Sequence, residues 1–124
     1  MKISDHTVVA FVPTKNYEQA RAFYVDKLGL EFLSEDSFAM VLRSGAVMIR
    51  VVKVQFTPVP FTILGWNVND IRGAVQDLAG KGVAFERFPF FDQDDLAIWT
   101  SPDGSKVAWF KDPDGNTLSI SKHA

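Results

Sequence analysis

Leu28-Gly29-Leu30-Glu31-Phe32 has a counterpart in Lys81-Gly82-Val83-Ala84-Phe85, 53 positions later in the chain. In both stretches a glycine ends a helical pattern, and an apolar strand pattern follows. Upstream, Tyr17 matches Ile71 at a separation of 54 positions. A repeat of this length predicts that the fold holds two copies of one supersecondary unit.

The first copy, about residues 7–54, has the pattern of a strand, a helix and three further strands. Residues 7–14 are β-branched and apolar, which favours a strand. Asn16 is suited to cap a helix whose apolar residues recur at three- and four-residue steps until Gly29. Turn-forming polar residues then separate three short apolar runs, at 31–34, 38–42 and 46–54.

The second copy, about residues 61–122, repeats this order after a proline-rich join at 55–60. A helix capped by Asn69 or Asp70 is expected to end at Gly80 and Gly82. An irregular segment is expected at 89–95, and Pro-Asp-Gly turns at 102–104 and 113–115. Strands are expected at 61–68, 83–88, 96–100, 107–111 and 117–121. The prediction is one α+β domain over residues 1–124, with two βαβββ modules side by side.

Composition narrows the class of protein. The chain is 47% hydrophobic and 23% charged, which suits a packed core and argues against disorder. A net charge of −2 with scattered basic residues gives no field for nucleic acid, so no nucleic-acid partner is expected. No apolar run approaches the roughly 20 residues of a membrane helix, and the N-terminus lacks a signal-like apolar region. A cytoplasmic protein without membrane association is the expectation.

Two segments resemble the signatures of a known family. Residues 20–24 (ARAFY) with 28–30 (LGL), and residues 110–116 (FKDPDGN), resemble those of the glyoxalase, bleomycin-resistance and extradiol-dioxygenase superfamily, the vicinal-oxygen-chelate fold. The resemblance covers essentially the whole chain. It implies that the two modules form a curled mixed sheet, the glyoxalase/bleomycin resistance fold, and that the protein is a homodimer. In enzymes of that superfamily, His or Glu side chains on the concave face bind a divalent metal.

The positions at which the resemblance places metal ligands hold other residues here. The first strands of the two modules offer Val9 and Ile63, and the last strand offers Ser119 where a metalloenzyme carries Glu. The remaining position falls near Ile49 or Arg50; a guanidinium repels a cation. His6 and His123 lie near the chain ends, where a solvated histidine is the usual finding. We therefore expect no metal and no cofactor.

A ligand-binding face is predicted from strand alternation, which places hydroxyl and amide side chains among apolar residues. Trp99 and Trp109 either stack on a planar ligand or fill core and interface volume. Arg50 and Lys53 could each pair with an anionic ligand, although a solvated position is the more usual one for Lys53. The acids of 92–95 form either an exposed turn or a border that receives a cationic group. The alternative to a ligand-binding face is that the hydroxyls of the last strand, those of Thr117, Ser119 and Ser121, merely face solvent. The predicted ligand-binding residues are Phe11, Arg50, Asn67, Trp99, Ser119 and Ser121.

The leading functional hypothesis is a metal-independent small-molecule-binding protein that sequesters an antibiotic-like or aromatic compound. The alternative is a metal-dependent lyase, isomerase or dioxygenase of the same fold, and a third is an interaction module whose aromatic surface serves assembly. The sequence identifies neither the ligand nor any catalytic residue, so whether the protein is an enzyme stays open at this point.

Overall fold

The computed structural model describes all residues, 1–124, and divides into two compact units, Met1–Thr57 and Pro58–Ala124. The division falls within the proline-rich segment. No helix is both long and apolar enough to span a bilayer.

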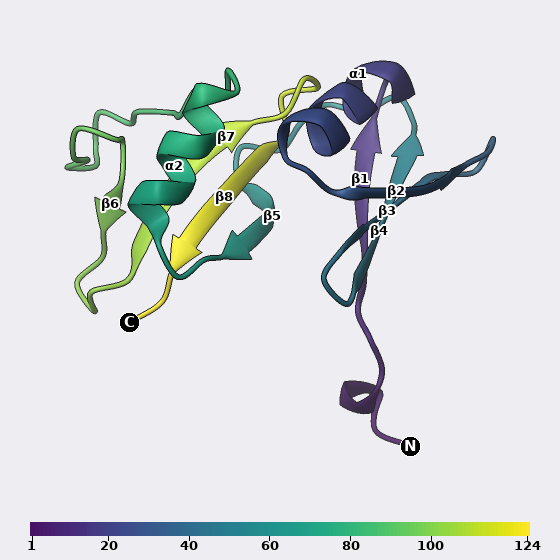
Figure 1. Ribbon diagram of the computed structural model, residues 1–124, viewed down its shortest axis with the longest axis horizontal. Helices are drawn as coiled ribbons and strands as arrows, with labels where there is room; N and C mark the ends of the chain where they lie inside the picture. The colour runs from purple at the N-terminus through teal and green to yellow at the C-terminus, as the bar shows by residue number, and fades with distance from the viewer. The chain divides into compact units, whose positions relative to one another are not determined.

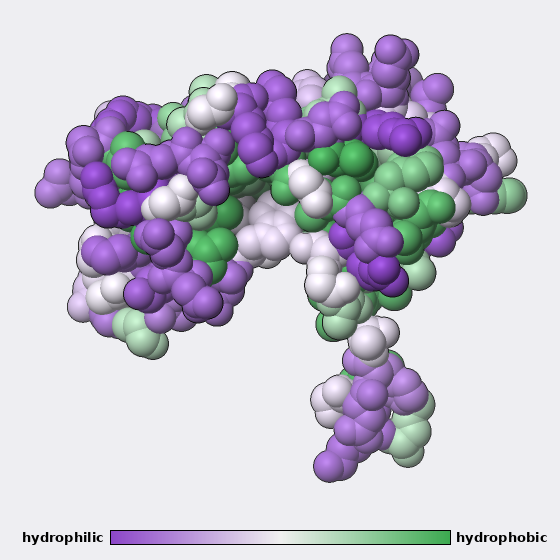
Figure 2. Space-filling model, in the orientation of Figure 1, coloured by the Kyte–Doolittle hydropathy of each residue, from purple (hydrophilic) through white to green (hydrophobic).

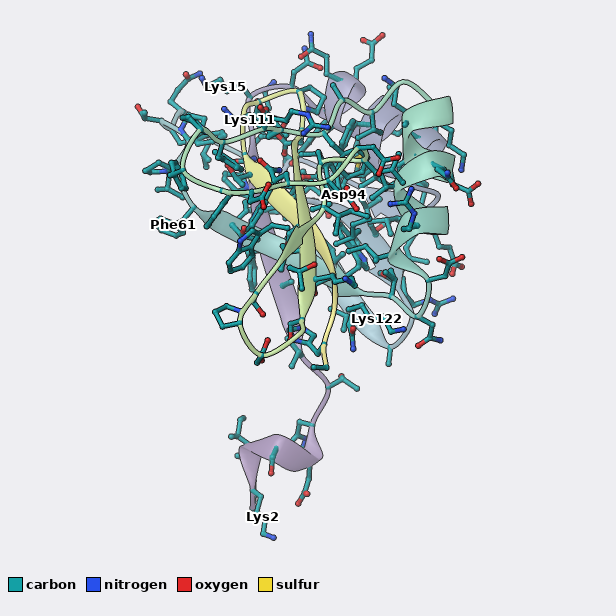
Figure 3. All side chains as sticks on the ribbon, turned by 90° about the vertical axis from the view of Figure 1, so that its left-hand side faces the viewer. Lys2, Lys15, Phe61, Asp94, Lys111 and Lys122 are labelled. Atoms are coloured by element: carbon teal, nitrogen blue, oxygen red, sulfur yellow. The ribbon has the colours of Figure 1, made fainter.

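The first unit is a four-stranded sheet with a helical segment on one face (Figure 1). The strand order is β1-β4-β3-β2, with β1 parallel to β4 and the other neighbours antiparallel. A short 3-10 helix, η1, precedes β1 on an exposed N-terminal arm, where Figure 3 labels Lys2. The elements are η1 (Ile3–Asp5), β1 (Val9–Thr14), α1 (Tyr17–Arg21), η2 (Ala22–Lys27), β2 (Glu31–Glu35), β3 (Met40–Ser44) and β4 (Val47–Lys53).

The second unit has the same topology. Its strand order is β5-β8-β7-β6, again with a parallel pair, β5 and β8, followed by antiparallel neighbours. The elements are β5 (Thr62–Asn67), α2 (Ile71–Gly80), β6 (Trp99–Thr100), β7 (Lys106–Lys111) and β8 (Thr117–Lys122). The repeat in the sequence is therefore a repeat of the fold, and the predicted α+β class with two βαβββ modules is confirmed.

Each unit packs its core between one sheet face and its helix. Helix α1 contacts β4, and α2 contacts β7 and β8. Burying each large aliphatic side chain contributes about 1.5–3 kcal/mol, so this packing determines which face of each strand turns toward the helix. The buried apolar residues are Val12, Ala20, Phe23, Tyr24, Leu30, Ala39, Met40, Leu42, Ile49 and Val51 in the first unit, and Ile71, Val75, Val83, Ala97, Ile98, Ala108, Phe110, Leu118 and Ile120 in the second.

The helix ends follow the predicted capping chemistry. The side-chain oxygen of Asn16 accepts a hydrogen bond from the backbone N–H of Gln19 at 3.0 Å. Asp70 rather than Asn69 caps α2, because its carboxylate accepts from Gly73 N–H at 3.1 Å. Gly29 adopts φ +79°, the left-handed conformation expected after the first helix.

Three predictions of secondary structure are wrong in detail. The first helix does not stay α-helical: from Ala22 it continues as a π-helix, with Leu28 N–H bonded to Phe23 C=O. The wider turn accompanies burial of the consecutive aromatic residues Phe23 and Tyr24, which meet edge to face at 5.3 Å.

The segment predicted as a strand at 83–88 forms only an isolated bridge, Phe85 to Phe110. The amide of Gln93 replaces a neighbouring strand there: its oxygen accepts from Phe88 N–H, and its nitrogen donates to Glu86 C=O. The strand predicted at 96–100 shortens to β6, because Ala97 adopts φ +65°, which interrupts extended backbone.

Candidate functional site

The sheet face of the second unit that points away from α2 carries a row of three cross-strand neighbours. Gly65 on β5 pairs with Ser119 on β8, and Ser119 pairs with Trp109 on β7. Residues directly opposite in neighbouring strands share a face. Their alternating partners Leu118, Ile120, Ala108 and Phe110 are buried on the helix side, so Gly65, Ser119 and Trp109 face the other way.

Ser119 lies in a notch that Gly65 leaves open. A Cβ atom at Gly65 would come within 2.6 Å of Ser119 Oγ, so any larger residue would displace the hydroxyl. Ser119 as a whole residue is 9% exposed, and its side chain makes no hydrogen bond within the chain. Its oxygen still reaches the surface, because the only fully enclosed side-chain polar atom without a partner is Tyr17 Oη. A hydroxyl buried to this extent without a partner is costly unless a ligand or water binds it.

The neighbouring rows of the same face add further polar groups. Thr117, two residues before Ser119, is likewise 9% exposed with no partner in the chain for its hydroxyl. Ser121 pairs with Asn67 across the sheet, and its Oγ lies 3.2 Å from His123 Nε2. We call Asn67, Thr117, Ser119 and Ser121 the hydroxyl floor. Thr117 and Ser119 are buried as residues, whereas Ser121 is half-buried.

Next to the hydroxyl floor stands a group of stacked rings from β6, β7 and the segment before β6. The Phe91 ring is stacked on Trp109 with centroids 5.3 Å apart and an interplanar angle of 6°, and on Trp99 at 4.6 Å and 28°. Phe88 meets Trp109 edge to face at 5.5 Å, and Phe90 packs on Phe91 at 4.7 Å. We call Phe88, Phe90, Phe91, Trp99 and Trp109 the aromatic block.

Hydrogen bonds hold the segment that carries Phe91. Asp94, labelled in Figure 3, accepts bonds from the backbone N–H groups of Leu96 and Ile98, both at 2.9 Å. Gln93 also donates to Ala97 C=O at 2.8 Å. The acidic segment is thus a built turn rather than a loose loop, and it fixes the ring of Phe91 against the two tryptophans.

Two arginines neutralise the outer side of this turn. Arg72, at the start of α2, donates to Asp94 at 3.0 Å and to Asp95 at 3.1 Å, and Arg87 donates to the backbone carbonyl of Asp94 at 2.9 Å. The hydrogen bond from Arg72, followed by its charge, lowers the pKa of Asp95 below its ordinary value, and Asp95 raises the pKa of Arg72. A cavity of about 280 Å³ opens beside the turn, lined by Asp92, Gln93, Asp94, Ile98, Trp99 and Thr100.

Of the predicted ligand-binding residues, the structure brings Asn67, Trp99, Ser119 and Ser121 to one face of the second unit. Phe11 and Arg50 are direct neighbours on the corresponding face of the first unit, where Phe11 pairs with Arg50 and Arg50 pairs with Val41. Of the two candidates for the fourth ligand position, Ile49 is buried against the helix, whereas Arg50 faces outward. Lys53 has the parity of Ile49 and ends the strand, so it does not share the face of Arg50.

The donor set does not suit a divalent metal. The chain brings together no group of three or more His, Cys, Asp or Glu side chains that could hold one. The position expected for a carboxylate holds Ser119, whose neutral hydroxyl is a weak ligand compared with Glu. His6 and His123 are both exposed near the chain ends, as predicted.

Three contributors to this face were missed or underweighted in the sequence. Gly65 interrupts a strand pattern, a signal that often marks close approach of another group. Thr117 was expected on the same face as Ser119, but it was not among the predicted ligand-binding residues. Phe91 gave no signal, because it lies in a segment without periodicity and its role depends on the turn around Asp94.

Comparison with known proteins agrees with this fold. The sequence profile of the Glyoxalase/Bleomycin resistance protein/Dioxygenase superfamily matches residues 3–120. A glyoxalase family protein from Bacillus anthracis is 22% identical, with 96% of this chain and 95% of that one covered and a TM-score of 0.74. A glyoxalase family protein from Enterococcus faecalis is 26% identical, with coverage of 94% and 95% and a TM-score of 0.65.

A bleomycin resistance determinant encoded on the transposon Tn5 is 18% identical, with coverage of 95% and 98% and a TM-score of 0.75. The search among curated proteins gave no match. The profile match spans nearly the whole chain, and the strand order repeats in both units. The chain therefore belongs to the Glyoxalase/Bleomycin resistance protein/Dioxygenase superfamily.

Proposed function

We propose that this protein binds a small, planar, partly aromatic organic molecule on the outward face of the second unit's sheet, without a metal ion. The observation that carries the proposal is the hydroxyl of Ser119: the residue is only 9% exposed, its hydroxyl makes no hydrogen bond within the chain, and it lies in the notch beside Gly65. A buried hydroxyl that retains access to the surface gains most from a ligand that supplies its missing hydrogen bond.

The two surfaces around Ser119 define the ligand's chemistry. The aromatic block offers ring faces and edges for stacking, and such contacts contribute about 0.5–1.5 kcal/mol beyond burial of area. The hydroxyl floor offers groups that both donate and accept hydrogen bonds. A flat ring system carrying oxygen or nitrogen atoms on one edge satisfies both, with its plane against the rings and its polar edge over Ser119 and Asn67.

Metal independence is supported by the chemistry of the residues at the expected ligand positions, Val9, Ile63, Arg50 and Ser119. Two are aliphatic, one is cationic and one is a neutral hydroxyl. Lewis-acid catalysis needs ligands that hold the ion in an open site, and this set has no carboxylate or imidazole. These residues therefore support binding of an intact compound, and sequestration would follow from tight binding.

The likeness to the transposon Tn5 bleomycin resistance determinant agrees with a sequestering role, although at 18% identity it concerns the fold alone. Sequestration requires only tight binding of the intact compound, and no chemical step. We further propose that the protein acts as a homodimer, an assembly that the superfamily resemblance implies.

Ligand binding is tested by titrating planar heteroaromatic compounds, such as hydroxyquinolines and quinones, into the protein while tryptophan fluorescence and heat are recorded. Ser119→Ala is expected to lower the affinity for the tightest-binding compound by about tenfold, which corresponds to the loss of one buried hydrogen bond. Trp109→Leu is expected to weaken it as well. Ser37→Ala, an exposed serine in a turn, is the matched control and should change nothing. Equal affinities for the parent and Ser119→Ala would refute the site.

The enzyme alternative is tested by elemental analysis of protein purified without chelators or a histidine tag. Retention of less than about a tenth of an equivalent of zinc, nickel, manganese or iron after incubation is expected from the ligand chemistry. A stoichiometric, tightly bound ion would instead favour the metal-dependent lyase, isomerase or dioxygenase.

A further inference from the structure

The outward face of the first unit's sheet carries two arginines: Arg43, which is paired with Glu31, and Arg50, which has apolar neighbours. Arg50 pairs with Phe11 on one side and Val41 on the other. The next row contains Val9 and Met48. Phe11 is 64% exposed, Val9 42% and Met48 37%, and Figure 2 shows hydrophobic side chains gathered over the strands of this unit.

Arg50 differs from every other arginine of the chain in that its side chain makes no hydrogen bond, ion pair or ring contact within the chain. Arg43 donates to Glu31 at 2.6 Å, and Arg21 lies 3.8 Å from the centroid of the Phe32 ring. Arg72 and Arg87 bond the acidic turn before β6. Arg50 is half-buried and makes no hydrogen bond or ion pair within the chain.

The nearby carboxylates of the same unit are already engaged. Glu31 shares the row of Met48 and Arg43, and its carboxylate is bonded to Arg43. Asp36 accepts hydrogen bonds from the N–H groups of Phe38 at 2.8 Å and Ala39 at 3.0 Å. These bonds, and to a smaller extent the charge of Arg50, lower the pKa of Asp36, but Arg50 makes no hydrogen bond or ion pair with it. The guanidinium of Arg50 therefore retains its donors for a group from outside the chain.

Within the internal repeat, the position of Arg50 in the first unit corresponds to that of Ser119 in the second unit. Both residues occupy the centre of their sheet face, on the strand that runs parallel to the first strand of the unit. Each has an aromatic cross-strand neighbour, Phe11 beside Arg50 and Trp109 beside Ser119. The polar group at the centre differs, so the two faces select different chemistry.

We propose that the outward face of the first unit is a second binding site, specific for an organic monocarboxylate with an aromatic body. The guanidinium fork of Arg50 matches a carboxylate in two parallel hydrogen bonds. Phe11, Val9 and Met48 cover the ring. A phosphate monoester fits less well, because it carries about −1.5 to −2 charges at neutral pH and one guanidinium on an apolar face leaves part of that charge uncompensated.

The test compares 2-naphthoate with its neutral analogue 2-naphthamide, using amide chemical shifts of the full-length, isotope-labelled protein. The naphthoate is expected to shift signals of β1, β3 and β4 and to bind about tenfold or more tightly than the amide. Arg50→Met, which keeps the apolar stem, should remove that preference. Arg50→Lys should keep part of the preference for naphthoate. The control is Arg43→Met: Arg43 lies on the same face but is paired with Glu31, so its loss should leave most of the preference intact.

Three results would overturn this proposal. Equal binding of the acid and the amide by the unaltered protein would do so without any variant. Naphthoate shifts confined to residues 58–124 would place the anion elsewhere. A change of sedimentation mass in Arg50→Met, with no naphthoate binding by the parent, would assign this face to a second copy of the chain. None of these results touches the binding of neutral planar compounds at Ser119, so the two proposals fail separately.

Discussion

Gly65 and Ser119 are cross-strand neighbours whose side-chain spaces overlap: a Cβ atom on Gly65 would stand 2.6 Å from Ser119 Oγ and 3.2 Å from the Ser119 carbonyl oxygen. The hydroxyl is thus oriented over a missing side chain. Gly65 has no left-handed backbone to explain it, because only Gly29, Gly45, Gly82, Gly104 and Gly115 have positive φ. The space above Ser119 is the structural consequence of the glycine.

Gly65→Ala is expected to weaken ligand binding at the hydroxyl floor by about tenfold, because the new methyl group displaces the Ser119 hydroxyl. The free energy of unfolding should fall by about 1–2 kcal/mol, because the hydroxyl can rotate away but the Ser119 carbonyl oxygen, 3.2 Å from the new methyl group, cannot. Calorimetric titration and urea unfolding measure the two effects.

A double-mutant cycle sharpens this prediction. If the methyl group acts through the hydroxyl, Gly65→Ala should cost much less affinity in a Ser119→Ala background than in the parent. Gly80→Ala is the control, because a Cβ there meets nothing within 4 Å. Fully additive losses in the double variant would show that Gly65 acts independently of Ser119.

The sequence alone predicts the repeat because each unit obeys local rules. Alternation along β1 and β8 correctly separates Val12 and Ile120, which are buried, from Phe11 and Ser121 on the opposite face. The same alternation places Ser119 and Asn67 together. These predictions depend only on strand period and on which face meets a helix, and both are written in the order of residue types.

The aromatic block could not be predicted in this way. Phe91 reaches Trp99 and Trp109 only because Gln93 and Asp94 bind backbone groups of the same turn, which replaces the strand expected at 83–88. Side-chain to backbone bonds of this kind compete with sheet ladders and have no periodic signal. The pairing of Ser119 with Trp109 likewise joins two strands, and it cannot be read from either strand alone.

Phe91→Leu is expected to lower the free energy of unfolding by about 1–2 kcal/mol, because leucine keeps apolar volume but loses the stacking on two indoles. Urea unfolding followed by far-ultraviolet circular dichroism measures it. Phe90→Leu serves as the control. Because Phe90 is 74% exposed, its replacement should lower the free energy of unfolding by less than half as much. Equal costs would mean that the stacked geometry contributes nothing beyond apolar area.

Asp112 organises the turn that leads into β8. Its Oδ1 accepts from the N–H groups of Asp114 and Asn116, both at 2.9 Å, and its Oδ2 accepts from Asn116 Nδ2 at 2.8 Å. Both Asp112 and Asn116 are buried. Asp112→Ala is expected to destabilise the protein by about 2–4 kcal/mol, because it leaves buried donors unpaired.

Disruption of this turn should also disturb the hydroxyl floor, because Thr117 directly follows Asn116. Ligand affinity in Asp112→Ala is expected to fall even where the protein remains folded. Asp92→Ala, an exposed aspartate with no hydrogen bond in the chain, should alter stability by no more than about 0.5 kcal/mol. Should Asp112→Ala fail to fold, Asp112→Asn retains one acceptor oxygen and allows the comparison at smaller cost.

Arg72 makes the stability of the acidic turn dependent on pH. Its hydrogen bond and charge lower the pKa of Asp95 in the folded protein below that of the unfolded chain. A lowered folded pKa stabilises the fold above the unfolded value, about 3.9, and this contribution disappears as pH falls through the folded value. The pH dependence therefore lies in the acid range, whereas near neutral pH the contribution is fully present and does not change with pH.

Arg72→Gln is expected to raise the pKa of Asp95 toward its ordinary value and to flatten the loss of stability in acid. Carbon-detected magnetic resonance of the Asp95 carboxyl gives the pKa, and urea midpoints between pH 2 and 6 give the stability. Because the pair is exposed, salt at about 1 M should reduce the difference between parent and variant. Arg43→Gln, which breaks the ion pair with Glu31, should leave the Asp95 titration unchanged. An unaltered Asp95 curve in Arg72→Gln would show that the backbone of the turn, rather than Arg72, sets its acidity.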